Sequence, residues 1–195
     1  MIKTIVFTDI YNSSKLWKAN PKGMYKKLVK HNDIVFKIAK ENKGFIVKNL
    51  GDSFMIVFDE LKKAIDFAIA LQEEFPLIIS EKQKLELKIG IAQGEVNEKK
   101  YVLQGCNLKD YFGHTVNVAS RLESKVAKKN QIAISILNGK NNYSRIIRGL
   151  AEKGKYRMKV VKYKESCKEP KNINYECRLL SGLHGIGELE AYVLY

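Results

Sequence analysis

The stretch Val6–Trp17, VFTDIYNSSKLW, joins an apolar segment to the start of a helix and places a carboxylate between them. The run over residues 2–7 is largely β-branched or apolar, which is typical of a buried strand. Asp9 follows at the end of this run, where burying an unpaired carboxylate is costly. Residues 12–14, Asn-Ser-Ser, are types that cap the N-terminus of a helix. The pattern leaves two interpretations for Asp9: a helix cap or a cation ligand.

Composition predicts a globular protein. The chain has 195 residues, 45% of them hydrophobic, which is enough for one full core. No apolar run approaches the roughly 20 residues of a membrane-spanning helix, and the N-terminus does not resemble a signal peptide.

The three cysteines, Cys106, Cys167 and Cys177, show no metal-ligand spacing. Although Cys167 and Cys177 could pair in an oxidising compartment, we expect reduced thiols in a cytoplasmic protein without membrane association.

Lys and Arg outnumber Asp and Glu by 35 to 21, so the formal net charge is +14. Such an excess can serve a polyanionic partner: nucleic acid, a membrane surface or phosphates. No basic stripe is interleaved with aromatic residues, and much of the lysine lies on predicted helix faces and in residues 153–171. We therefore favour a solvated surface that keeps the protein soluble, and we expect no nucleic-acid partner.

Hydrophobic periodicity predicts strand, helix, hairpin, helix, strand, helix and strand in that order. This order favours an α+β fold, with a ferredoxin-like core sheet and helices packed on one face. Residues 136–180 are lysine-rich and show no clear pattern. The expected strands are 1–8, 45–50, 53–58, 85–96, 131–135 and 187–195, the expected helices are 21–42, 61–75 and 113–129, and residues 97–112 form a loop or arm.

A second carboxylate lies in the predicted hairpin turn, at Gly51-Asp52. If the first strand pairs beside this hairpin, Asp9 and Asp52 project from the same edge of the sheet. Two such carboxylates repel each other, and Mg²⁺ or Mn²⁺ would relieve the repulsion. The alternative is that Asp9 only caps a helix and Gly51-Asp52 is only turn chemistry.

Five segments spread over nearly the whole chain resemble one family, the class III nucleotidyl cyclases. VFTDIYNSSKLW resembles the opening of their catalytic domain, and GFIVKNLGDSFMIVF their metal-binding hairpin. LKIGIAQGEV is similar to the strand that leads to their dimerisation arm. DYFGHTVNVASRLES resembles the motif for base recognition and transition-state stabilisation, and GIGELEAYVL the closing strand. The resemblance implies a single cyclase catalytic domain over residues 1–195, with no regulatory domain.

The resemblance implies a two-metal site and a phosphate site next to it. Two divalent cations, Mg²⁺ or Mn²⁺, would be held by Asp9, by Asp52 and by the backbone carbonyl of Ile10. In the family, one ion activates the ribose 3′-hydroxyl and the other holds the β- and γ-phosphates. The helix start after Asp9 would contact the triphosphate through Tyr11, Asn12, Ser13 and Ser14.

The resemblance also implies the residues that act on the ribose, the α-phosphate and the base. Asn117 would orient the ribose and Arg121, four residues later, would stabilise charge on the α-phosphate. Lys48 and Asp110 would recognise the base, and Lys with Asp favours ATP, whereas guanylyl cyclases typically carry Glu and Cys there. The alternatives are that Arg121 is a solvated helix charge, that Lys48 is a surface lysine and that Asp110 is a loop aspartate.

In this family two subunits contribute residues to each site, so the resemblance implies a head-to-tail homodimer and an inactive monomer.

The chain departs from the family pattern at His184, which stands where many relatives carry a triphosphate-binding lysine. The expected function is adenylate cyclase, which makes 3′,5′-cyclic AMP and pyrophosphate from ATP. The alternatives are a cyclase for a pyrimidine or guanine nucleotide, and a degenerate cyclase fold that binds nucleotide without catalysis.

Overall fold

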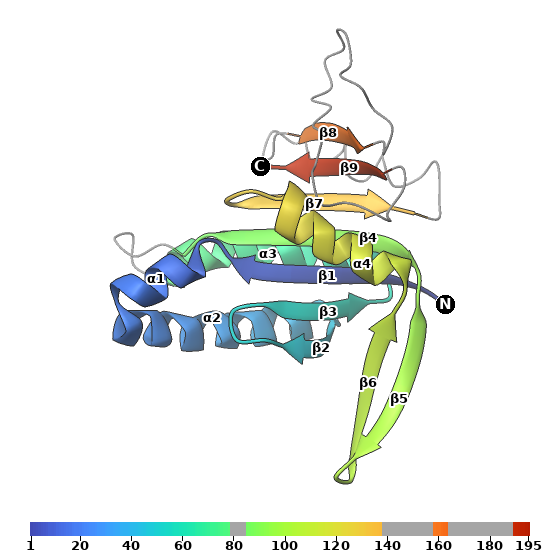
Figure 1. The fold of residues 1–195 in the computed structure, drawn as a ribbon, viewed down its shortest axis with the longest axis horizontal. Helices are drawn as coiled ribbons and strands as arrows, with labels where there is room; N and C mark the ends of the chain where they lie inside the picture. Colours follow the sequence, from blue (N-terminus) through green and yellow to red (C-terminus); the bar gives the residue numbers. More distant parts are fainter. Residues whose placement is uncertain (79–84, 138–157, 164–188) are drawn as a thin grey trace, which may run out of the picture.

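The computed structural model describes residues 1–78, 85–137, 158–163 and 189–195. The chain forms one large sheet, a two-stranded arm and four α-helices within these ranges (Figure 1). A short π-helix, η2, continues α4. The elements are β1 (Ile2–Ile10), α1 (Ser13–Ala19), α2 (Pro21–Glu41), β2 (Phe45–Asn49), β3 (Phe54–Phe58), α3 (Leu61–Ile78), β4 (Leu87–Glu95), β5 (Asn97–Leu103), β6 (Cys106–Phe112), α4 (His114–Arg121), η2 (Leu122–Val126), β7 (Gln131–Ile136), β8 (Met158–Tyr163) and β9 (Leu189–Leu194).

The sheet has the strand order β2-β3-β1-β4-β7-β9-β8. Adjacent strands of the sheet run antiparallel, except β4 and β7, which run parallel to each other. The first half, β2-β3-β1-β4 with α2 and α3 as its crossovers, has the arrangement of a ferredoxin-like βαββαβ unit. The predicted α+β fold with a ferredoxin-like core sheet is therefore confirmed.

The placement of the helices corrects one detail of the prediction, because helices cover both faces of the sheet. Helices α2 and α3 pack on one face, over side chains such as Val6, Ile56 and Ile89. Helix α4 and η2 pack on the opposite face, over Val57 and Ala92 (Figure 1). All five residues of β3 are buried, so both faces of the strand need a covering layer.

Gly90 of β4 allows α4 and η2 to lie directly against the sheet. A Cβ at this position would come within 2.3 Å of the backbone N of Glu123 and 2.4 Å of the backbone O of Ala119. Both distances are far below van der Waals contact, so only glycine fits without moving the helix. The close approach sets how near the residues of η2 come to the surface of β4.

The structure agrees with the sequence prediction for residues 97–112 and corrects it for residues 113–129. Residues 97–112, expected as a loop or arm, form the hairpin β5–β6, which extends beyond the sheet (Figure 1). The expected single helix 113–129 is wrong in its second half, because α4 ends at Arg121 and the chain continues as the π-helix η2. π-Helical turns are rare and are found frequently at functional sites.

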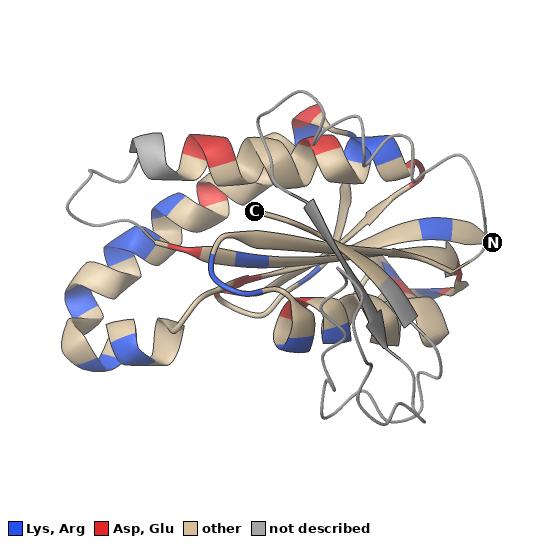
Figure 2. Cartoon of the chain, turned by 90° about the horizontal axis from the view of Figure 1, so that it is seen from above, with Lys and Arg blue, Asp and Glu red and all other residues tan. Residues whose placement is uncertain are grey.

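Several expectations lie outside the described residues: the thiols Cys167 and Cys177, the departure at His184, and most of the lysine-rich segment 153–171. Cys106, within the described part, is a free and exposed thiol at the start of β6. Among the helices of the described chain, none combines the length and apolar character needed to cross a membrane. Several lysine positions follow one another along α1 and α2, where Figure 2 colours the ribbon blue, and Lys15, Lys18, Lys22 and Lys26 are exposed.

Candidate active site

The register of β1 brings the first two predicted site residues to the same end of the sheet. Strand β1 pairs antiparallel with β3 up to Thr8 opposite Phe54, so Asp9 lies next to the turn that contains Asp52. That turn is closed by a hydrogen bond from Leu50 N to Ser53 O (2.8 Å), and Gly51 takes the left-handed conformation with φ 89°. The Asn49 side chain accepts a hydrogen bond from Gly51 N at 2.9 Å. The two carboxylates therefore lie at the same edge of the sheet, close enough for the charge of Asp52 to raise the pKa of Asp9.

A lysine from the neighbouring strand lies between Asp9 and a third carboxylate. Lys88 of β4 is directly opposite Asp9 in the β1–β4 register, so the two side chains share a face of the sheet. Lys88 Nζ lies 3.2 Å from Asp9 Oδ2 and 2.6 Å from Glu123 Oε1. Glu123 belongs to η2, which the absence of a side chain at Gly90 brings down onto this face. All three charged side chains are largely shielded from solvent.

The electrostatics of this cluster favour a cation. Burial raises the pKa of Asp9 above its usual value, the Lys88 ammonium acts against this rise, and the charge of Asp52 adds to it. Burial likewise raises the pKa of Glu123, with Lys88 opposing and Asp9 and Asp52 adding. For Lys88 burial alone would lower the pKa, but Glu123 and then Asp9 outweigh it and the pKa is raised. The site therefore concentrates negative charge that a single lysine only partly compensates.

The donor set suits a metal ion that takes part of its coordination from its substrate. In the described ranges, no group of three or more His, Cys, Asp and Glu side chains is arranged to hold a metal. Asp9 and Asp52 supply two carboxylates at one edge, and Mg²⁺ or Mn²⁺ typically binds one or two carboxylates and completes its shell with phosphates and water. Ile10, whose backbone carbonyl was the third expected ligand, is fully buried at the end of β1.

The segment after β1 starts α1 without a side-chain cap. Asn12 adopts a left-handed conformation with φ 57°, and its side chain makes no capping hydrogen bond. Ser13 and Ser14 form the first turn of α1, and Tyr11 N is bonded to Glu86 O at 2.7 Å. Asn12, a residue type that often caps helices, therefore occupies the N-cap position without capping through its side chain. An anion can use backbone N–H groups of a first turn that no side chain caps.

Asn117 and Arg121 lie on the exposed side of α4. The opposite side of this helix is buried against the sheet through Thr115, Val118 and Ala119. Because they are four positions apart, Asn117 and Arg121 share one face, and both are exposed. A guanidinium in this position can bind a phosphate brought to it from outside the chain.

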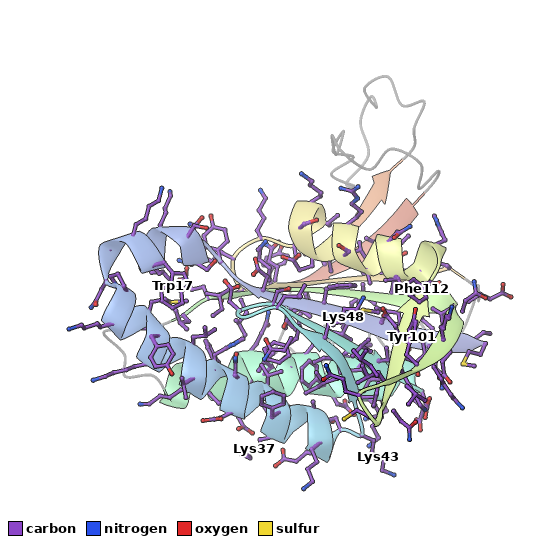
Figure 3. All side chains as sticks on the ribbon, turned by 60° about the horizontal axis from the view of Figure 1, so that its bottom comes forward. Trp17, Lys37, Lys43, Lys48, Tyr101 and Phe112 are labelled. Atoms are coloured by element: carbon purple, nitrogen blue, oxygen red, sulfur yellow. The ribbon has the colours of Figure 1, made fainter. Side chains whose placement is uncertain are left out.

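The second pair of predicted site residues forms an ion pair in a cleft. Lys48 Nζ of β2 lies 2.8 Å from Asp110 Oδ2 of β6, and Asp110 Oδ1 accepts a hydrogen bond from Tyr111 N at 2.8 Å. The cleft, of about 400 Å³, lies between β2 and the arm. Figure 3 shows Lys48 beside the arm that carries Tyr101 and Phe112, and Lys48 Nζ is 6.0 Å from the Phe112 ring centroid. A cleft of this size, lined by apolar side chains and by a few polar ones that include this pair, suits a flat, partly polar group.

A family model, "Adenylate and Guanylate cyclase catalytic domain", matches residues 3–159 of the chain. The chain belongs to this cyclase family. The resemblance expected from the five sequence segments is thereby confirmed.

The cyclase domain is similar to two fungal proteins named adenylate cyclase, from Podospora anserina and Schizosaccharomyces pombe. Each is 32% identical over an alignment of 152 residues, and the match covers 67% of this chain. The match covers only 7% and 9% of the two relatives, so the chain spans less than a tenth of their length.

Solved structures agree with the fold. The guanylate cyclase domain of RhGC from Catenaria anguillulae in complex with GTP superposes with a TM-score of 0.71, at 22% identity, covering 100% of this chain and 96% of that one. The adenylyl cyclase CyaB from P. aeruginosa gives a TM-score of 0.68 at 21% identity, covering 100% of this chain and 93% of that one. At these identities the likeness establishes the cyclase fold alone.

In the structure, the predicted site residues of the cyclase domain form three separate pairs. Asp9 and Asp52 form one, Lys48 and Asp110 another, and Asn117 with Arg121 a third on α4. The sequence reasoning missed Lys88 and Glu123. Lys88 stands in LKIGIAQGEV, two residues before Gly90 on the same face of β4, and Glu123 stands in DYFGHTVNVASRLES. The only signal in the sequence was that each of these two segments contains a residue of opposite charge to the other, Lys88 and Glu123.

Proposed function

We propose that this cyclase domain converts ATP into 3′,5′-cyclic AMP and pyrophosphate. The observation that carries the proposal is the ion pair between Lys48 and Asp110 in a cleft. An ammonium donates a hydrogen bond to adenine N1, and a carboxylate accepts one from the 6-amino group. Guanine presents an oxygen acceptor and an N–H donor at these edges, so the same pair would be mismatched. The relatives named adenylate cyclase support this choice.

The reaction needs activation of the 3′-hydroxyl and stabilisation of the leaving group. Asp9, Asp52 and the backbone carbonyl of Ile10 would hold two divalent cations, Mg²⁺ or Mn²⁺, and the shared edge of the two carboxylates fits this role. Such cations, when bound, lower the pKa of the attacking hydroxyl and neutralise charge on the leaving pyrophosphate. Residues 11–14, at the uncapped start of α1, would contact the triphosphate.

The third group of residues would act on the α-phosphate and the ribose. Arg121 would donate hydrogen bonds to the α-phosphate as charge develops there, and Asn117 would orient the ribose. Both side chains are exposed on α4. We propose that they act on nucleotide bound to the Asp9 and Asp52 of a second subunit, in a head-to-tail homodimer with two equivalent sites. The exposed apolar tip of the arm, with Val102 77% and Leu103 59% exposed, supports association through this hairpin.

The test is incubation of the purified protein with ATP, GTP, CTP and UTP separately, with Mn²⁺ present, and identification of the products by mass spectrometry. We expect 3′,5′-cyclic AMP and pyrophosphate from ATP, and a loss of about 100-fold or more in the Asp9→Ala variant. A matched control is Asp66→Ala, which removes a carboxylate paired with Lys62 on α3. A cyclic pyrimidine nucleotide as main product would replace the proposal with a pyrimidine cyclase. No cyclic product from any of the four would favour a non-catalytic nucleotide-binding domain.

A further inference from the structure

The cluster of Lys88, Asp9 and Glu123 has a charge arrangement that the proposed reaction does not use. Among the residues that the structure describes, Lys88 is the cation within ion-pair distance of Asp9, and Asp9 is a proposed metal ligand. The same ammonium lies nearer to Glu123, at 2.6 Å, than to Asp9, at 3.2 Å. Glu123 is nearly buried, with 10% of its side chain exposed, and is supplied by a π-helical turn.

A divalent cation at Asp9 would meet the ammonium of Lys88 within a few ångströms. Like charges so close repel strongly in a shielded site. Lys88 must therefore separate from Asp9 when the cation enters. An ammonium that is largely shielded from water and loses one carboxylate partner needs another. Glu123 is already in contact with Lys88 and meets this need with a small movement of the lysine side chain.

We propose that Lys88 is a resident counter-cation which holds Asp9 in the metal-free protein and is transferred wholly to Glu123 when a divalent cation binds. Glu123 is then a positioning residue that tunes how readily Asp9 accepts its cation. The inference rests on the proposed metal site and adds to it the control of metal affinity. The opposed positions of Lys88 and Asp9 in the β1–β4 register, and the close approach allowed by Gly90, keep the three groups together.

The test measures Mn²⁺ binding without nucleotide, by the loss of the free-ion electron paramagnetic resonance signal during titration. In Glu123→Gln the lysine keeps Asp9 as its one anionic partner within the described part of the chain, so the affinity for Mn²⁺ should fall roughly tenfold. In Lys88→Met the competing cation is gone, so the affinity should rise by a similar factor, while the metal-free protein melts at a lower temperature. Lys88→Arg keeps the charge and should remain close to the wild type.

A double-mutant cycle separates the transfer from a general charge effect. In the Lys88→Met background, Glu123→Gln should change the Mn²⁺ affinity much less than it does in the wild type. Equal effects in both backgrounds, or weaker Mn²⁺ binding by Lys88→Met, would overturn the inference. The matched control Lys62→Met removes an ammonium paired with Asp66 elsewhere, and should change the affinity by less than about twofold.

One more variant distinguishes failure of the inference from failure of the proposed metal site. Asp9→Ala should lose most of the Mn²⁺ affinity. If it binds Mn²⁺ as the wild type does, the metal site is misassigned and the inference falls with it. If Asp9→Ala loses binding but the cycle is additive, the metal site stands and the transfer alone is wrong.

Discussion

Lys48 and Asp110 present opposite hydrogen-bonding capacities from one ion pair, since an ammonium only donates and a carboxylate only accepts. Their cleft is bordered by residues of β2 and of the arm, which is where the proposed base would lie. In such a site a mismatched base leaves donors or acceptors unpaired. Selectivity at the level of single residues therefore comes from the cost of the wrong contacts as much as from the gain of the right ones.

Two unpaired groups at about 1–3 kcal/mol each correspond to a preference for ATP over GTP of roughly 30- to 10⁴-fold. Lys48→Glu combined with Asp110→Cys should reduce ATP turnover sharply without creating efficient GTP turnover, because the rest of the cleft is unchanged. The measurement is kcat/KM for all four nucleotides under one metal condition. If CTP or UTP proves the best wild-type substrate, the assignment of this pair to adenine is wrong.

His31 of α2 is fully buried beside Phe54 and Phe75, with ring centroids 5.7 and 5.2 Å away. Its Nε2 has no hydrogen-bond partner among the residues that the structure describes. Burial lowers the pKa of His31 below 6.5, against smaller raising effects of Asn32 and of the Asp52 charge. The folded protein therefore holds this imidazole neutral at a pH where an unfolded chain would protonate it.

The unfolded state binds a proton at His31 more readily than the folded state does. The contribution of the neutral His31 to the free energy of unfolding is therefore fully present above pH 6.5, and it is lost as the pH falls toward and through the folded-state pKa. Each pH unit in this window costs up to about 1.4 kcal/mol from His31 alone. Urea midpoints between pH 5 and 8 should show the decline, and His31→Phe should flatten it. An equal decline in the wild type and in His31→Phe would assign the pH dependence to other groups.

Helix α4 and η2 form one continuous element that has a buried side and an exposed side. Its buried side fixes the element to the sheet through Val118, Ala119 and Leu122, and its exposed side carries Asn117 and Arg121. The π-helix that follows Arg121 carries Glu123, whose Oε1 lies 2.6 Å from Lys88 Nζ. Small residues of the sheet, Gly90 and Ala92 among them, allow the element to lie close.

Gly90→Ala should push this element away from β4, since the new methyl group would meet backbone atoms of Ala119 and Glu123, which cannot rotate aside. Overpacking of this kind costs about 1–3 kcal/mol of folding free energy. Activity should fall further than stability alone explains, because Arg121 and the Lys88–Glu123 contact move together. Thermal melting and kcat at a temperature where the variant is folded test this, and a stable, fully active variant would contradict it.

At the scale of the whole molecule, one chain holds the proposed metal ligands on its sheet edge and the proposed phosphate-binding arginine on the exposed face of a helix. The arm β5–β6 extends from the sheet and exposes apolar side chains, including Tyr101 and Leu108. A second copy can cover these side chains and supply the missing half of each site. The proposed catalytic unit is therefore the dimer.

Subunit mixing tests the dimer directly. Asp9→Ala and Arg121→Ala should each be inactive alone, and their mixture should regain activity because one site of each heterodimer keeps both residues. At equal amounts and random pairing, half of the dimers are heterodimers with one working site of two, so about a quarter of wild-type activity should return. Heterodimers that form without any recovery would contradict the shared site.

The amino-acid sequence determined which residues are candidates and in which order the elements occur. The cyclase family, the α+β fold and the hairpin at Gly51-Asp52 were all predicted, because apolar periodicity, turn residues and motifs are local properties of the chain. Asp9 and Asp52 could be placed at one edge because a strand beside a hairpin shares its end. The roles of Asn117, Arg121 and the other site residues stay predictions until they are measured.

Tertiary structure alone decided which side chains meet across the sheet. The contact of Lys88 with Asp9 depends on the antiparallel register of β1 with β4, and that with Glu123 on the close approach at Gly90. The covering of both sheet faces and the π-helical end of α4 were missed for the same reason. Periodicity reports how polar and apolar residues alternate along one element. The partner that each face meets is set by register and packing between segments far apart in the sequence.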